Sequence, residues 1–500
     1  MAEFSKFSDK TNTYDVKDAK ARTDIGTLSN LTTTAKTNAV SAINEVDTEV
    51  DGANAKVGSL SNLTTKTKIS TVAAINELNS NLTAVMSDIG LLGNDVVGLE
   101  VDFENYIYTR LAAADGLTAG SDFNKFDMFG GRRRCNVDDS GMILAWYGDD
   151  DYVEDGSNGQ VMVYQPAFYY KVIPLKLEDI NDGVGGKHLR KARYYISDNP
   201  HPGFERYPAF YDSNGKEVDY IFMSAYEGSV FDVSANSYIL DDAQTTDFAV
   251  GTGDKLCSIA NAKPCSGLTQ QLTRANAETI AQNRGNIWHI DTIKAESVNQ
   301  LLFMIEYASL NSQNAIGKGV VSKTDDGSTN MSEITGATSS LGNSTGMASG
   351  TNGLVSVSYR GIENFWGNIW KFSEGLTLWG DGTLRGGQPY ICDDYTFVEN
   401  TKTGYTAAKF TVSNTSNYIS AFGYDPDFDW LFLPSECVNA DSNYPIGDHS
   451  NVTSDLNDYR ISLLGARWAV GVPAGAFCWA LHTGAGNRSR YIGARLLYLL

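Results

Sequence analysis

The sequence predicts an α+β protein in which an N-terminal helical coiled-coil stalk carries a mainly β head. Apolar residues alternate every three and four positions up to Tyr106, which is the seam of a coiled coil. Beyond Tyr106, short β-prone runs bounded by Gly, Asp and Asn dominate. At 500 residues the chain is too long for a single core. We expect an arm at 1–24, the stalk at 25–107, a first head part at 108–353 and a C-terminal head part at 354–500.

Residues 1–24 are charged and have no apolar period, which is typical of an arm that orders on docking. They contain no apolar core of the kind found in signal peptides, so no secretory signal is expected. No stretch of about 18 apolar residues occurs in the chain, which predicts no membrane insertion.

An internal repeat follows the arm. Copies starting at Ile25 and Val57 share SNLTT and end in INEV or INEL, and a third start falls at Ile89. SNLTT is a polar, turn-forming stretch, and the residues after it are typical of a helix. The repeat predicts a segmented spacer of helices and polar breaks.

The seam of the stalk runs from Ile75 to Tyr106. A lone helix would leave this seam in water, and the mixture of Ile, Val and Leu favours a parallel trimer. The alternative is a single amphipathic helix packed on its own domain. The residues predicted to hold a homotrimer together are Ile75, Leu78, Leu82, Val85, Ile89, Leu92, Val96 and Leu99, and Phe103 and Tyr106 continue the same spacing.

The head is predicted from short apolar runs. GMILAWYG, GQVMVYQPAFYYKVIPL and VDYIFMSAYEG read as strands, and residues 295–310 read as a helix with one apolar face. Residues 322–353 are almost free of large apolar side chains, which indicates a hairpin tip or a disordered excursion. Short strands return from Leu354. The chain ends on an apolar strand, 496–500, which must be paired inside a sheet.

Charge and cysteines restrict the class of protein. Sixty acidic residues against 39 basic ones give a net charge of −21, which opposes binding to nucleic acid. Local basic spots occur at Arg132, Arg133 and Arg134 and at Arg488 and Arg490; their alternative reading is solvated loops or internal ion pairs. The six cysteines form no Cys-x-x-Cys pair, so they predict reduced, buried thiols and no zinc site.

No catalytic or metal motif stands out. Asp425, Asp427, Asp429 and Glu436 occupy the first, third, fifth and twelfth places of an EF-hand loop. The sixth place, which needs Gly, is Trp430, so calcium is not expected. Neither HExxH nor GxSxG occurs. We therefore expect no enzyme activity, no cofactor and no bound metal.

Several of these runs resemble a known family. The SNLTT repeats look like linker segments of tailed-phage virion proteins. The runs GQVMVYQPAFYYKV, YRGIENFWGNIWKF and GAFCWALHTGAGNRSRYIGARLLYLL resemble the phage-encoded C-type-lectin-like head, which shares the fold of formylglycine-generating and sulfatase-modifying factors. The resemblance spans nearly the whole chain, and its last segment is the most specific. The oxygen-dependent enzymes of that fold hold copper with two nearby cysteines, whereas Cys437 and Cys478 lie 41 residues apart.

The resemblance also implies roles for residues. It assigns a scaffold role to Gly361, Trp366, Gly367, Trp370, Gly493 and Arg495, and it places the ligand on the loop from Trp479 to Tyr491. That loop is rich in Trp, Tyr and Arg, the side chains that dominate binding hot spots and suit glycans. The predicted receptor-binding residues are Trp479, His482, Asn487, Arg488, Arg490 and Tyr491. The alternative is that Trp479 and Tyr491 point into the core and the arginines pair with nearby acids.

Together these observations predict a non-enzymatic fibre protein of a phage virion, made in the host cytoplasm. Its expected partners are other copies of itself, other virion proteins through the N-terminal arm, and a bacterial surface receptor, either a glycan or a protein. The alternative is a capsid-attached head fibre or decoration protein with a structural or adhesive role. A surface depolymerase is a third class.

Overall fold

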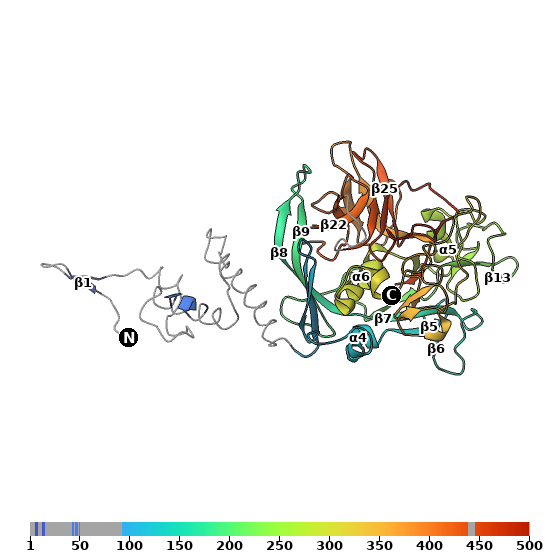
Figure 1. Cartoon of the computed structure of the whole chain (residues 1–500), viewed down its shortest axis with the longest axis horizontal. Helices are drawn as coiled ribbons and strands as arrows, with labels where there is room; N and C mark the ends of the chain where they lie inside the picture. The colour runs from blue at the N-terminus through green and yellow to red at the C-terminus, as the bar shows by residue number, and fades with distance from the viewer. Residues whose placement is uncertain are drawn as a thin grey trace. The chain divides into compact units, whose positions relative to one another are not determined.

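The computed structural model describes residues 6–8, 13–15, 43–44, 46–48, 50, 93–438 and 446–499. The chain divides into two compact units, Met1–Ala84 and Val85–Leu500 (Figure 1). In the first unit, β1 (Lys6–Ser8) pairs antiparallel with β2 (Thr13–Asp15), and residues 43–44, 46–48 and 50 are helical. The second unit contains the strands of the two large sheets.

A large, mainly antiparallel sheet forms one part of the second unit. Its strands follow the order β10 (Glu205–Arg206), β8 (Tyr169–Asp179), β9 (Lys187–Ser197), β22 (Asn417–Tyr424), β24 (His449–Asn451), β26 (Trp479–Thr483), β25 (Tyr459–Leu464), β19 (Trp370–Trp379), β20 (Gln388–Cys392) and β21 (Tyr405–Ala407). Four strands join off this path: β23 (Pro434–Val438) on β22, β27 (Ile492–Gly493) on β19, β3 (Val96–Asp102) on β9, and β4 (Ile107–Ala112) on β3. The sheet therefore unites segments from both predicted parts of the head.

A second sheet contains the end of the chain. Its order is β15 (Trp288–Ile290), β28 (Leu496–Tyr498), β11 (Tyr220–Ser224), β7 (Gln160–Pro166), β5 (Arg133–Val137) and β6 (Ile143–Trp146). β28 pairs with β15 on one side and with β11 on the other. The prediction that the apolar terminal strand is paired inside a sheet is confirmed. Two small sheets complete the strands: β13 (Ser237–Ile239), β12 (Ser229–Asp232) and β14 (Lys255–Cys257), and β16 (Gly346–Met347), β17 (Val357–Tyr359) and β18 (Ile362–Glu363).

The helices of this unit are few and short in its described part. They are η2 (Ser121–Lys125), α4 (Asp127–Gly130), α5 (Arg274–Gln282), α6 (Ile293–Tyr307), α7 (Ser312–Ala315) and η3 (Ser339–Leu341). Helix α6 confirms the predicted helix. The Thr292 side chain caps its start by accepting from the backbone N–H of Ala295, and Ala308 ends it in the left-handed region. Every residue of α6 except Tyr307 is buried, so its polar side is covered as well as the side that carries Val298, Leu301, Leu302 and Ile305. Figure 1 shows the helix among the strands of the second unit.

The predicted coiled-coil stalk is wrong wherever the structure describes its seam. Val96 and Leu99 lie in β3 with fully buried side chains, and β3 pairs with β9 over its whole length. Phe103 is also buried, and Tyr106 has φ of 61° in the turn before β4. The sequence VVGLEVD contains three valines and a glycine, all of which disfavour a helix, and the β-branched valines suit a strand.

The mostly β unit thus replaces a long helix over these residues. The spacing misled because Val96, Leu99, Phe103 and Tyr106 fall at steps of three and four, although Val97, Leu99, Val101 and Phe103 alternate with non-apolar residues as in a strand. The other predicted seam residues, Ile75, Leu78, Leu82, Val85, Ile89 and Leu92, lie outside the described residues.

The polar stretch at 322–353 forms a packed loop that includes η3 and β16. Ser332, Thr335 and Thr338 are buried, although their side chains are polar. The Thr335 hydroxyl donates to the Ile259 carbonyl at 2.8 Å, and the Thr338 hydroxyl donates to Glu363 at 2.7 Å. Hydrogen bonds, rather than apolar side chains, therefore hold this loop on the head.

The residues that the resemblance assigned to the scaffold lie in the core. Trp366 and Trp370 are buried, and Arg495 donates to the carbonyls of Ser224 and Glu363. Gly367 has φ of 80°, and a Cβ there would lie 3.0 Å from the Val320 carbonyl oxygen. These positions fit a structural role.

All six cysteines are free and buried, as predicted. No helix among the described residues is long and apolar enough to cross a membrane.

Candidate functional site

Strand β26 leads into the loop that the sequence singles out. Alternation along the strand turns Trp479 and Leu481 toward the main core, while Ala480 packs with the apolar cluster on the other side. The Trp479 ring is fully buried, and its indole N–H donates to the Phe432 carbonyl at 2.9 Å. Trp479 is therefore a core residue, and its assignment to the binding set is corrected. His482, on the same strand, is exposed.

Three of the predicted residues meet around one cavity of about 210 Å³. His482 lies on β26, Asn487 lies in the loop, and Tyr491 is the residue immediately before β27. The other lining residues are Trp370, Asn451, Leu463, Arg467, Val470, Ala480, Thr483 and Ile492. His482 and Asn487 are exposed, whereas Tyr491 is half-buried. The fold thus brings together an imidazole, an amide and a phenol at a cavity lined by residues of the interior strands β24, β26, β25 and β19 of the main sheet.

Arg488 lies on a second hollow, of about 370 Å³, with Gly267, Leu268 and Gln271. The Arg488 guanidinium donates to the Gln271 side-chain oxygen at 2.8 Å. The backbone N–H of Gly267 donates to the Ser489 carbonyl at 2.9 Å, and a Cβ at Gly267 would lie 2.3 Å from the Ser489 nitrogen. Gly267 therefore permits the close approach of the two loops.

Arg490 is held by the polar loop that follows residue 322. Its guanidinium bonds Asp325 at 2.6 Å and the Thr329 carbonyl at 2.6 Å. Asp325 also accepts from Arg467 at 2.8 Å, so one carboxylate joins two arginines. The hydrogen bond from Arg490 lowers the pKa of Asp325. For Arg490 the alternative reading from the sequence, pairing with nearby acids, is confirmed.

Two aromatic rings support the same side of the loop. The rings of Trp468 and Tyr491 meet edge to face, with centroids 6.5 Å apart. The Arg467 guanidinium lies 4.7 Å from the Tyr491 ring centroid, and Arg490 lies 5.6 Å from that of Trp468. Such contacts hold a phenol ring in one orientation. Tyr491 is therefore a fixed part of the surface.

Sequence reasoning missed Asp325, Arg467 and Trp468. Arg467 and Trp468 stand side by side in GARWAV, a run read only as a strand, and Asp325 stands in a stretch read as an excursion. The adjacent arginine and tryptophan were the available signal, because these two types are enriched in binding surfaces. More than 140 residues separate Asp325 from its partners, so no local pattern could link them.

The four carboxylates at EF-hand positions are engaged by protein groups, and Lys409 serves two of them. Asp425 accepts from the backbone N–H of Lys409 at 2.7 Å, and Asp427 pairs with the Lys409 ammonium at 2.5 Å. Asp429 accepts from the Tyr170 hydroxyl at 2.9 Å. Glu436 accepts from Arg190, whose hydrogen bond lowers the pKa of Glu436 to about 2. No cluster of three or more potential metal ligands occurs among the described residues.

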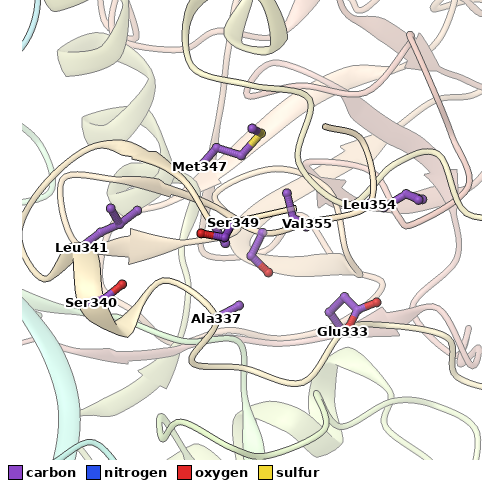
Figure 2. A pocket seen from close by; sticks show the side chains of 10 residues that line it. Glu333, Ala337, Ser340, Leu341, Met347, Ser349, Leu354 and Val355 are labelled. Atoms are coloured by element: carbon purple, nitrogen blue, oxygen red, sulfur yellow. The ribbon is translucent and has the colours of Figure 1, made fainter. Parts of the chain in front are cut away.

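Another hollow, of about 270 Å³, lies beneath the loop that follows η3 (Figure 2). Its walls are Ala337, Ser340, Leu341, Met347, Ala348, Ser349, Leu354, Val355 and Ser356, with Glu333 as the charged member. Small and aliphatic side chains dominate this wall, so it offers little for specific recognition.

Comparisons with known proteins give a faint likeness. No family model matches the chain, and no curated protein matches it. Among solved structures, it is similar to the Major Tropism Determinant P3c variant at 11% identity and a TM-score of 0.22. It is also similar to the U1 and I1 variants, each at 12% identity and a TM-score of 0.24. These alignments cover 77% of this chain and 73–74% of the other chains. Superpositions this loose carry no argument about function.

Proposed function

We propose that this chain is a non-enzymatic virion protein that binds a receptor on the bacterial surface. The contact surface comprises His482, Asn487, Arg488 and Tyr491. The observation that carries the proposal is the shared cavity: His482, Asn487 and Tyr491, singled out from the sequence, line it together. The receptor is a glycan or a protein, because imidazole, amide and phenol groups recognise either one.

The support around the loop favours recognition of a partner. Arg467, Asp325 and Arg490 form one ion-pair network that joins the polar loop to the C-terminal loop. A loop fixed in this way loses less conformational entropy on binding, so even a small contact area gives useful affinity. An isolated surface ion pair contributes little to stability. The Asp325 carboxylate is shared by two arginines, so it is better suited to holding the C-terminal loop in one conformation.

The N-terminal arm is the part of the chain that we propose attaches it to the virion. Residues 1–24 are the proposed docking arm that binds other virion proteins, and the head then faces outward. This role needs no cofactor.

A binding assay tests the contact surface directly. Purified full-length protein is titrated onto cells of the strain on which the phage grows, and its ability to block infection is measured. His482→Ala and Asn487→Ala are each expected to weaken binding about fivefold or more, because both side chains lie exposed on the cavity.

The matched control removes an equally exposed side chain elsewhere. Asn214→Ala changes a loop residue that lines neither hollow of the C-terminal loop, and it is expected to bind as the unchanged protein does. Unchanged circular dichroism for all variants shows that the fold is intact. Full binding by both cavity variants, or no binding by the unchanged protein, would contradict the proposal.

A further inference from the structure

Three polar side chains outside the C-terminal loop meet in the core of the second unit. Glu227 follows β11, Asn364 follows β18, and Lys371 is the second residue of β19. Each of the three residues is 1% exposed or less. A lysine is almost never buried to this extent unless its charge is compensated. The surroundings of the Lys371 amine therefore decide its chemical state.

The Lys371 amine is held beside Asn364. Its Nζ donates to the Asn364 backbone carbonyl at 3.1 Å, which is its one hydrogen bond among the described residues. Only Cα and Cβ separate that carbonyl group from the Cγ of the same asparagine. Burial lowers the pKa of Lys371, and the positive charge of Arg495 adds to the effect. Both influences favour the uncharged amine, which is the nucleophilic form.

The side-chain nitrogen of Asn364 faces an acid. Nδ2 donates to a Glu227 carboxyl oxygen at 3.2 Å and to the Ser356 hydroxyl at 3.2 Å. The Asn364 Oδ1 has a long contact, 3.4 Å, with the backbone N–H of Val357. If the Cγ–Nδ2 bond of this carboxamide breaks, the departing nitrogen already lies at a proton donor.

Glu227 is suited to supply that proton. Burial raises the pKa of Glu227, which favours the protonated acid. One of its oxygens accepts from Asn364 and Asn368, whereas the other has no hydrogen-bond partner. A charge on a buried carboxyl group with an unpartnered oxygen is costly, so the protonated form is favoured again.

Asn368 is less suited to react, because both ends of its carboxamide are used. Its Oδ1 accepts from the backbone N–H of Glu333 at 2.6 Å, and its Nδ2 donates to Glu227 and to the Glu333 carbonyl. These contacts tie Asn368 to the polar loop at 322–353. Asn368 therefore positions Glu227, and the carboxamide of Asn364 is the one open to attack.

We propose that Lys371 and Asn364 join in an intramolecular amide bond inside the folded core. The Lys371 Nζ attacks Cγ of Asn364, so that an Nζ–Cγ bond forms and the Cγ–Nδ2 bond breaks. Glu227 gives its proton to Nδ2, which leaves as ammonia, and takes one proton from Nζ. Glu227 is thereby restored, and no oxidant, cofactor or second reactant is needed. The reaction occurs once per chain and does not depend on the role of the C-terminal loop.

The bond resolves the state of the buried amine. An amine with a single hydrogen bond becomes a neutral amide, so the core no longer holds a group that carries charge when protonated. The link also closes the connection between β18 and β19 into a ring. This connection carries Trp366, which is fully buried, so the bond fixes a part of the chain on which the core packs.

Tryptic mapping of the full chain tests the bond directly, because trypsin cleaves after lysine but not after a lysine whose amine is acylated. Without the bond, cleavage after Arg360, Lys371 and Arg385 yields peptides 361–371 and 372–385. With the bond, we expect a single peptide 361–385 whose mass is lower than that of its sequence by one ammonia molecule. Fragmentation of this peptide should release no fragment that ends between Phe365 and Trp370, since both sides of each break stay linked.

Two variants examine the reacting groups. Lys371→Met removes the amine and should yield peptide 361–385 at its full sequence mass. Glu227→Gln keeps the shape but cannot donate the proton, so cleavage after Lys371 should return without loss of ammonia. The matched control Lys409→Met changes an exposed lysine and should leave the ammonia deficit of peptide 361–385 intact. Circular dichroism of each variant checks its fold.

The map of the unchanged protein decides the matter even if a variant fails to fold. Complete cleavage after Lys371, with both peptides at their sequence masses, would overturn the proposal, as would loss of ammonia elsewhere in the chain alone. An undiminished ammonia deficit in a folded Glu227→Gln protein would remove the role given to Glu227. A branched peptide that joins Lys371 to Glu227 and lacks one water molecule would rule out Asn364 as the partner.

Discussion

Asp448 shows how a single buried carboxyl can set the pH response of the head. It is fully buried, and one of its oxygens accepts from the backbone N–H of Phe477 at 2.7 Å. The other oxygen has no hydrogen-bond partner. Burial raises the pKa of Asp448 well above its ordinary value. The folded protein therefore holds this proton at a pH where the unfolded chain has released it.

The sign of the effect on stability follows from this difference. Because the folded state binds more protons, the contribution of Asp448 is greatest below pH about 4 and is lost as pH rises toward the folded pKa. Asp448→Asn is expected to match the original protein near pH 4 and to be about 1–3 kcal/mol more stable at pH 8. Urea unfolding at several pH values measures this. A stability difference that does not change with pH would contradict it.

At the residue scale, the sequence predicted the location of the candidate site but not its support. His482, Asn487 and Tyr491 could be found because they fall within ten residues of a stretch whose composition suits binding. Trp479 was misassigned because alternation along β26, which turns its ring inward, is visible only once the strand limits are known. Asp325 could not be found, since it reaches the loop only through the tertiary fold.

At the element scale, the accuracy of each predicted helix or strand depended on which spacing of apolar residues was used to assign it. Runs such as VDYIFMSAYEG were read correctly as strands, because turn residues bound them and β-branched or aromatic residues fill them. β3 was read as part of a helix. Its apolar residues from Val97 to Phe103 do alternate, but the longer spacing of three and four from Ile75 to Tyr106 was given more weight than this local alternation. The pairing of β3 with β4 and β9 in the folded unit therefore makes this segment a strand.

The corrected role of β3 makes a prediction about stability. Leu99→Ala should destabilise the second unit by about 2–5 kcal/mol, because Leu99 is fully buried in its core. Since this core belongs to one chain, the unfolding midpoint should not depend on protein concentration. The control Ile107→Ala, at a side chain 55% exposed, should change stability by less than about 0.5 kcal/mol. An unfolding midpoint of Leu99→Ala that matches that of the original protein would contradict this placement.

At the scale of the whole molecule, the head binds its own C-terminus into the fold. β26 and β27 belong to the main sheet, so one sheet holds both ends of the C-terminal loop, and β28 then lies between β15 and β11 in the second sheet. The loop is further joined to the polar loop through Asp325. Exposed side chains of this loop can be replaced without loss of the core, because exposed side chains contribute little to stability.

The central claim is that the surface of the C-terminal loop touches the bacterial receptor. Photo-cross-linking from a benzophenone side chain placed at position 487, on cells of the strain that supports the phage, tests it most directly. The account predicts a cross-link to one cell-surface component, suppressed by excess unlabelled protein and absent when the probe stands at position 214. A cross-link formed from position 214 and not from position 487 would contradict the account.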